Sequence, residues 1–171
     1  MIGPVSYWAQ LKEDEKKVIQ NALSEIPVKV GKLARDLGLE VKAASLRPGI
    51  SGELRRSDST KSGFIIRVNR HERKYRQRFT IAHEIAHYLL HRHHIGQNGI
   101  VDDLLYRSSL SDAREAQANR LAADLLMPNF QLKKALEDSL TSNKQQLVSD
   151  FATAFDVSEA AMRIKLQNRM S

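Results

Sequence analysis

The sequence of 171 residues contains no cysteine. Disulfide bonds and cysteine-ligated metal sites are therefore excluded, so a metal site in this chain has to be built from histidine and carboxylate side chains. The absence of cysteine also fits a reducing compartment, and we expect a cytoplasmic protein.

Long apolar stretches are also missing. No run approaches the roughly 20 residues that a helix needs to cross a bilayer, and no secretory signal pattern opens the chain. We therefore expect no membrane partner. The chain also lacks internal repeats and low-complexity linkers. Its 42% hydrophobic and 27% charged residues are typical of a globular domain, and the length suits a single one.

The charge that is present is predominantly positive, with a formal net charge of +7 and a pI near 9.8. Much of the excess lies in one segment, residues 67–78. Such a segment is usually a solvated face, but it also permits contact with nucleic acid or with an acidic protein.

Hydrophobic periodicity predicts an α+β fold, a helical single domain with a small two- or three-stranded sheet. A β-branched apolar run at residues 64–68 is the strongest strand candidate. The predicted helices span residues 7–23, 30–37, 73–91, 112–127, 131–140 and 144–170 with a break at 156–158, and the predicted strands span residues 39–43, 51–55 and 64–68. We expect an N-cap at Asp112 and an irregular loop over residues 93–110.

One short pattern carries the chemistry: the H-E-x-x-H segment at residues 83–87. It lies inside a predicted helix, where residues four apart share a face, so His83 and His87 can reach one metal ion. Glu84 is placed beside the metal, where a carboxylate can act as general acid/base towards a metal-activated water. The alternative interpretation is a pair of surface histidines hydrogen-bonded to their neighbours.

A zinc site of this kind needs a third protein ligand. His91 continues the spacing, but it lies about 12 Å from His83 along a straight helix, too far for one ion, and is better placed either beside the ligands or at the surface. Glu115 is the preferred candidate, with Asn119 on the same face to orient a ligand. Asp112 and Asp124 are alternative candidates for the third ligand. Periodicity alone equally allows Glu115 to be a first-turn glutamate that the helix dipole stabilises.

Two longer segments, RFTIAHEIAHYLLH at residues 78–91 and EAQANRLAADLLMP at residues 115–128, resemble the ImmA/IrrE metallo-endopeptidases. The family pattern is R-F-T-x-A-H-E-x-x-H-x-x-x-H followed by E-x-x-A-N-x-F-A-x-x-L-L-M-P, and the one departure is Leu121 in place of phenylalanine. The resemblance implies a zincin-like active-site helix with Zn²⁺ held by His83, His87 and Glu115, and Glu84 as the general acid/base. The resemblance covers residues 26–130 well, and these residues are expected to form the metallopeptidase core. An N-terminal helix (residues 1–25) precedes the core, and a C-terminal helical segment (residues 131–171) follows it.

The resemblance further implies a protein substrate. Family members cut helix-turn-helix repressors, and some are toxins paired with an antitoxin, so a role in transcription regulation or in a toxin–antitoxin pair is expected. An edge strand at residues 64–68 or 51–55 would hold an extended substrate. The sequence does not choose which residue would stabilise the oxyanion of the reaction, and the candidates are Tyr106, Arg107, His93 and His94. The alternatives are a metal-stabilised binding module without proteolysis and a DNA-binding protein, since residues 148–166 have the rhythm of a helix-turn-helix.

Overall fold

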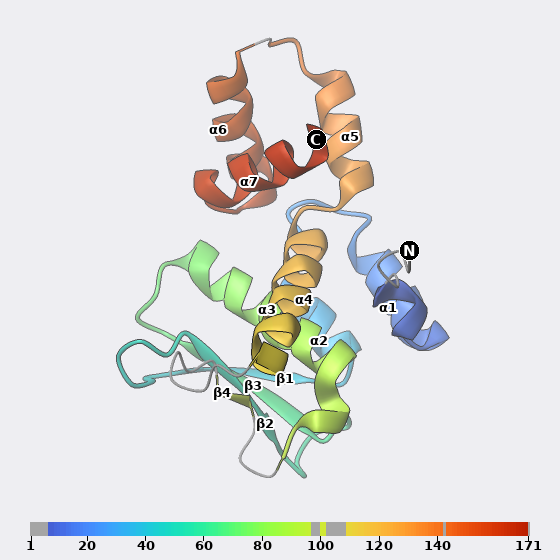
Figure 1. The fold of residues 1–171 in the computed structure, drawn as a ribbon, viewed down its shortest axis with the longest axis vertical. Coiled ribbons are helices and arrows are strands. Elements are labelled where there is room, and N and C mark those ends of the chain that lie inside the picture. Colours follow the sequence, from blue (N-terminus) through green and yellow to red (C-terminus); the bar gives the residue numbers. More distant parts are fainter. Residues whose placement is uncertain (1–6, 97–99, 102–108, 142, 171) are drawn as a thin grey trace.

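The computed structural model describes residues 7–96, 100–101, 109–141 and 143–170, and it confirms the predicted α+β class (Figure 1). None of the helices in these segments is long and apolar enough to cross a membrane. The helices are α1 (Glu13–Ala22), α2 (Val30–Asp36), α3 (Lys74–His91), α4 (Ser109–Leu126), α5 (Asn129–Asp138), α6 (Lys144–Phe155) and α7 (Glu159–Met170), with 3-10 turns at Tyr7–Gln10 and Arg92–His94. The strands are β1 (Glu40–Ala44), β2 (Gly52–Arg56), β3 (Phe64–Asn69) and β4 (Ile100–Val101).

The strands form one mixed sheet in the order β1-β3-β2-β4. β3 pairs in parallel with β1 and antiparallel with β2, so it has a hydrogen-bonded neighbour on each side. The prediction that residues 64–68 offer an edge to a substrate is therefore wrong, because both edges of this strand are already occupied. β2 pairs on its other side with the two-residue β4, opposite Glu53 and Leu54. β4 was not predicted, since two residues are too few to show a period.

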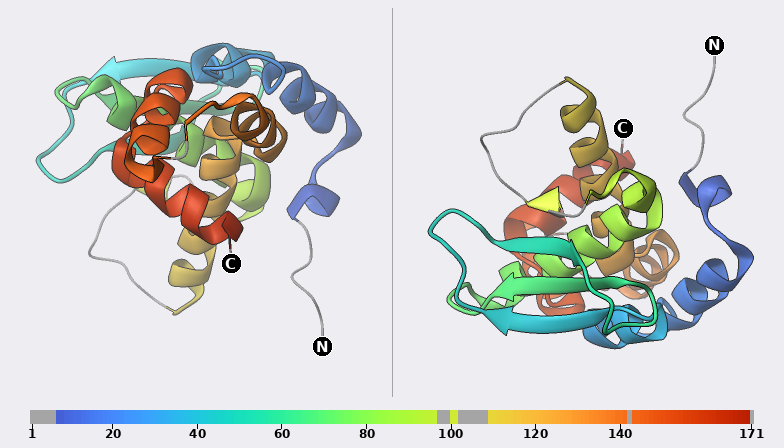
Figure 2. Two further views of the ribbon diagram at one scale, coloured as in Figure 1. Left: turned by 90° about the horizontal axis from the view of Figure 1, so that it is seen from above. Right: turned by 90° about the horizontal axis from the view of Figure 1, so that it is seen from below.

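The helices gather on one face of the sheet, as the view from below shows (Figure 2). The inner face carries apolar side chains that are almost fully buried, at Leu54, Ile66 and Val68. The outer face carries charged pairs instead. There the register places Glu53 opposite Arg67, and Arg67 Nη1 donates to Glu53 Oε1 at 2.5 Å. The alternation of apolar and charged residues along β2 and β3 thus fixes which face receives the helices.

The helix α3 runs across the inner face of the sheet, and α4 packs against α3 (Figure 1). Fully buried alanines occur four residues apart on each helix, Ala82 and Ala86 on α3 and Ala118 and Ala122 on α4. Helix axes approach more closely where the contacting side chains are small. These two helices therefore form the centre of the molecule.

The C-terminal helices α5 to α7 lie on the side of α3 and α4 away from the sheet (Figure 1). Phe151, Phe155 and Met162 bury their side chains in the same hydrophobic cluster as the sheet and α3. Two polar contacts add to this packing. Arg78 of α3 donates to the Asp156 carbonyl at 3.0 Å, and Lys165 of α7 forms an ion pair with Asp124 of α4.

Two helix starts differ from the prediction. The helix expected over residues 7–23 is a 3-10 turn followed by α1, which begins at Glu13. The acidic residues Glu13, Asp14 and Glu15 make a favourable first turn at that point, because negative charge stabilises a helix N-terminus. The helix α4 begins at Ser109, so the expected N-cap Asp112 lies within its first turn instead.

Candidate metal centre

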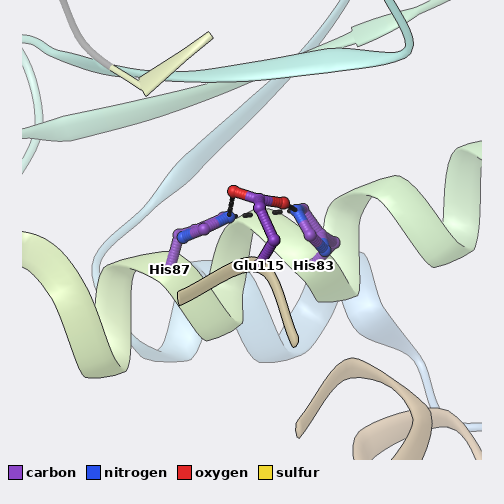
Figure 3. Close-up of side chains that lie close together, drawn as sticks. All are labelled: His83, His87 and Glu115. Atoms are coloured by element: carbon purple, nitrogen blue, oxygen red, sulfur yellow. Dashed lines mark hydrogen bonds and ion pairs between the residues drawn. The ribbon is translucent and has the colours of Figure 1, made fainter. Parts of the chain in front are cut away.

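The buried half of α3 positions the two histidines of the H-E-x-x-H segment. Ile85 and Ala86 anchor this part of the helix in the core, with no exposed surface. His83 and His87 lie one turn apart and are 5% and 1% exposed. Their rings project from the same side of α3 towards a carboxylate from α4 (Figure 3). Helical spacing thus sets the pair, as the sequence predicted.

The carboxylate belongs to Glu115, which lies in α4 and bridges the two rings (Figure 3). Its Oε2 lies 3.2 Å from His83 Nε2, and its Oε1 lies 3.0 Å from His87 Nε2. The two Nε2 atoms are 3.0 Å apart. Among the described residues, these three form the group whose ligand atoms lie within 4.8 Å of one another and could hold a metal ion.

The electrostatics of the cluster keep Glu115 ionised. Burial would raise the pKa of its carboxyl, but the hydrogen bonds from His83 and His87 outweigh that effect and bring the pKa well below its usual value. An ionised carboxylate presents lone pairs to the space between the rings, as a neutral imidazole does through its unprotonated nitrogen.

These donor atoms fit a divalent metal ion. Tetrahedral bonds of about 2.1 Å place neighbouring ligand atoms roughly 3.4 Å apart, and the three separations of 3.0 to 3.2 Å lie close to that value. Two imidazole nitrogens with one carboxylate oxygen are also a ligand set of catalytic zinc sites, which keep a fourth position open for water or substrate.

Glu84 lies outside this convergent group, although it adjoins His83 in the chain. Its side chain is fully buried and extends towards β2: a Cβ atom placed on Gly52 would lie 3.6 Å from Glu84 Oε1. The same Cβ would overlap Thr80 Cγ2 and lie 3.0 Å from the carbonyl oxygen of Arg67. Glycine at position 52 therefore lets β2 approach α3 closely beside Glu84.

His91 and Gln117 form a second layer behind the cluster. His87 Nδ1 lies 3.0 Å from His91 Nδ1, and His91 Nε2 lies 3.0 Å from Gln117 Oε1. His91 is 4% exposed, and burial lowers its pKa more than its hydrogen bond to Gln117 raises it. Of the two positions expected for His91, the structure thus supports the one beside the ligands and not the one at the surface.

The structure leaves other predicted residues away from the cluster. Asn119, expected to orient a ligand, is exposed, and the α4 side chain whose oxygen lies within hydrogen-bond distance of a histidine, His91, is Gln117 instead. Asp124 is paired with Lys165, and Asp112 is exposed. His93 and His94 are exposed in the 3-10 turn after α3, whereas Tyr106 and Arg107 lie outside the described residues.

Gln117 and Gly52 were missed at the sequence level. Gln117 follows Glu115 by two positions, and helical spacing gives no reason to group residues two apart. Its contact depends on where α4 crosses α3. Gly52 is the second residue of the strand predicted at residues 51–55, where an isolated glycine can signal a close approach of another segment, so that signal was available.

Comparison with known proteins agrees with this geometry. Residues 34–167, more than half of the chain, match the IrrE N-terminal-like domain of the M78 peptidases. The match extends beyond residue 130 and includes α5, α6 and most of α7. No curated protein matches the chain. With the two histidines and the glutamate brought together as described, the chain belongs to the ImmA/IrrE family of metallopeptidases.

Proposed function

We propose that this protein is a zinc-dependent endopeptidase in which His83, His87 and Glu115 hold the metal and Glu84 is the general acid/base. The observation that carries the proposal is the convergence of three donor atoms from two helices at separations that suit a tetrahedral ion. Membership of a metallopeptidase family supports it independently of the geometry.

Zinc is the metal that best suits this ligand set. The chain has no thiolates, and two imidazoles with a single carboxylate are borderline ligands that favour zinc over magnesium or calcium, which prefer oxygen ligands alone. When bound, zinc lowers the pKa of a coordinated water towards about 7 and polarises the scissile carbonyl.

The position of Glu84 in the chain and its burial support a role in proton transfer. It follows a proposed ligand directly in α3, and its side chain is fully buried between α3 and β2. In this role its carboxylate accepts a proton from the attacking water and returns it to the amine nitrogen as the peptide bond breaks.

The substrate is proposed to bind as an extended chain along the β2 and β4 side of the sheet. β2 lies next to Glu84 through Gly52, and within the part of the chain that the structure describes β4 pairs with Glu53 and Leu54 of β2. An extended peptide that adds to a sheet edge gains backbone hydrogen bonds at every second residue.

We further propose that the substrate is a regulatory protein of the cytoplasm, either a helix-turn-helix repressor or an antitoxin. The support is the resemblance of residues 78–91 and 115–128 to enzymes that cut such regulators. On this proposal the chain acts as one domain, in which residues 1–25 and 131–171 flank the metallopeptidase core.

The test is incubation of the zinc-loaded protein with the helix-turn-helix regulator encoded next to its gene. Mass spectrometry should find a single cut that a chelator prevents. Glu84→Gln removes the proton acceptor but no proposed ligand, so cleavage should fall by a factor of about 10² to 10⁴ while one zinc per chain is retained. Cleavage by Glu84→Gln at the wild-type rate would remove Glu84 from the mechanism, and a cut that survives metal removal would refute the metallopeptidase role for this substrate.

A further inference from the structure

Exposed cationic side chains gather at the end of the sheet where α3 begins (Figure 1). They come from residues 45–51 between β1 and β2, from residues 70–73 between β3 and α3, and from the first turn of α3. The pairing with β3 places the end of β1 and the start of β2 beside the end of β3, so both loops leave the sheet at the same end. We call this surface the basic end of the sheet, and its exposed cations are Arg47, Arg70, Arg73, Lys74 and Arg76.

Side-chain hydrogen bonds join the two loops. Ser45 Oγ lies 3.0 Å from His71 Nε2, and Ser51 Oγ donates to Glu72 Oε1 at 2.7 Å. Each of these contacts crosses from one loop to the other. The cations of the two loops therefore belong to one surface.

Little negative charge offsets the cations of this surface. Glu72 is the one acidic residue in the two loops and the first turn of α3, and its Oε2 lies 3.9 Å from Arg76 Nε. Lys74 pairs with Asp156 at 3.3 Å. Within the part of the chain that the structure describes, three of the cations form no ion pair: Arg47, Arg70 and Arg73.

The start of α3 departs from a charge rule that other helices of this chain follow. Negative charge stabilises a helix N-terminus, and positive charge at the same place is unfavourable. The helix α1 has three acidic residues in its first turn, and α7 begins with Glu159. The helix α3 has no acidic residue there and carries Lys74 and Arg76 instead, directly after Arg73. These cations weaken the helix on which they lie, which favours a role for them in binding an anion.

The chemistry of the basic end of the sheet favours a nucleic acid over an acidic protein. Four of its five exposed cations are arginines, whose planar guanidinium can bind a phosphate through two parallel hydrogen bonds. An interface with a protein has an apolar centre. Among the large apolar side chains that are exposed in the described residues, Tyr75, at 37%, is the one at this end of the sheet, and a tyrosine hydroxyl also binds phosphate oxygens.

We propose that the basic end of the sheet binds the phosphate backbone of duplex DNA. The net charge of +7 attracts a polyanion to the chain, and contacts to phosphates carry no sequence information, so this binding is non-specific. Duplex DNA is the expected form because a helix-turn-helix regulator is itself bound to it. The surface then brings the peptidase to a substrate on DNA, and this consequence rests on the proposed function.

The decisive variant combines Arg47→Gln with Arg73→Gln, one exposed arginine from each loop. Arg35→Gln combined with Lys61→Gln is the matched control, since it also removes two positive charges from exposed side chains. These two residues lie at the opposite end of the sheet, where the backbone of Ser62 bonds to that of Gly38. Both double variants should unfold at the wild-type temperature, because exposed side chains away from caps and ion pairs contribute little to stability.

Binding is measured by the polarisation of a fluorescent DNA duplex of random sequence, with the full chain, over a series of salt concentrations. The wild-type protein should bind with a Kd of about 10⁻⁴ to 10⁻⁶ M at physiological salt. The Arg47 and Arg73 double variant should bind about 10-fold or more weakly, and its slope of log affinity against log salt should be smaller by about 2. The control should stay within about threefold of the wild type, because its charges lie away from the bound phosphates and are screened.

Absence of DNA binding by the wild-type protein would overturn the inference, and so would equal losses in the two double variants. Tighter binding of polyglutamate than of the duplex would also overturn it, because the surface would then suit an acidic protein. Failure of the proposed function is distinguishable, since DNA binding is measured without a protein substrate and needs no cleavage.

Discussion

Two polar contacts of α3 differ in the kinds of group that they bring together. Near its start, the guanidinium of Arg78 meets the carbonyls of Phe155 and Asp156 and, at 3.3 Å, the Asp156 carboxylate. Further along, the ligand atoms of His83, His87 and Glu115 converge on one another. The first contact pairs a cationic side chain with oxygen acceptors, whereas the second brings together three groups that could each be a ligand of one metal ion.

This difference separates a structural contact from a functional one. The Arg78 contact is complete within the protein and joins α3 to the turn between α6 and α7. The cluster of three potential ligands could in addition hold a divalent cation, which can bind several lone pairs at once. A polar contact between helices therefore indicates a metal site when its side chains are all potential metal ligands, and a structural link when a hydrogen-bond donor meets carbonyl acceptors.

The largest effect is expected from Glu115→Ala, which breaks the functional contact and leaves the Arg78 contact intact. Loss of the anionic ligand should weaken zinc binding by more than about 100-fold, beyond the range typical of residues behind a ligand. Free zinc at about 100 times its dissociation constant should stabilise the wild-type protein by roughly 2.7 kcal/mol, and the variant should show no such gain at that concentration. Chelator competition and thermal unfolding measure the two effects.

The control for this variant is Glu137→Ala, which removes the same charge from a side chain of α5 that is 63% exposed. It should bind zinc like the wild type. Equal affinity in Glu115→Ala and the wild-type protein would mean that the carboxylate is not a ligand.

A smaller effect is expected from Arg78→Met, which breaks the structural contact instead. The side chain of Arg78 is 12% exposed, and its loss leaves the carbonyls of Phe155 and Asp156 without their donor. The free energy of unfolding should fall by about 1.5–3 kcal/mol, the usual range for hydrogen bonds to a charged group, as measured by urea denaturation. Zinc affinity should stay within about threefold, because the two contacts share no partner.

Arg73→Met supplies the comparison, since Arg73 is exposed and its replacement should change stability by less than about 0.5 kcal/mol. A large loss of zinc affinity in Arg78→Met would show that the two contacts are coupled through α3, contrary to the distinction drawn above.

The smallest effects concern the separation of β2 from α3. Gly52→Ala should cost about 1–3 kcal/mol of stability, because the added Cβ would overlap Thr80 and force β2 away from Glu84. Gly31→Ala is its counterpart: nothing lies within 4 Å of the new Cβ, and the position is inside α2, so stability should rise by up to about 1 kcal/mol. Urea denaturation of both variants should give opposite signs, and equal signs would contradict the close approach at Gly52.

The sequence predicted what depends on local spacing. The four-residue interval of His83 and His87 places both rings on one side of a helix wherever that helix lies in the fold. The β-branched run that became β3 was recognised for a similarly local reason.

What depends on contacts between distant segments could not be predicted in the same way. The central place of β3 follows from its pairing with β1 and β2 together, and a strand's own residues do not specify its neighbours. Gln117 reaches His91 only because α4 crosses α3 at that point. Asn119, chosen by helical spacing from Glu115, is exposed for the same reason.

Both imidazoles of the centre belong to a single helix, so backbone hydrogen bonds hold their mutual distance constant. The glutamate belongs to the other helix, and only the packing of small buried residues such as Ala118 and Ala122 sets how far it stands from the imidazoles. The affinity for the metal ion therefore depends on the distance between α3 and α4. A displacement of α4 by a few tenths of an ångström, introduced at any point along the helix, would be detectable as a change in metal affinity. No coordinating residue would need to be changed.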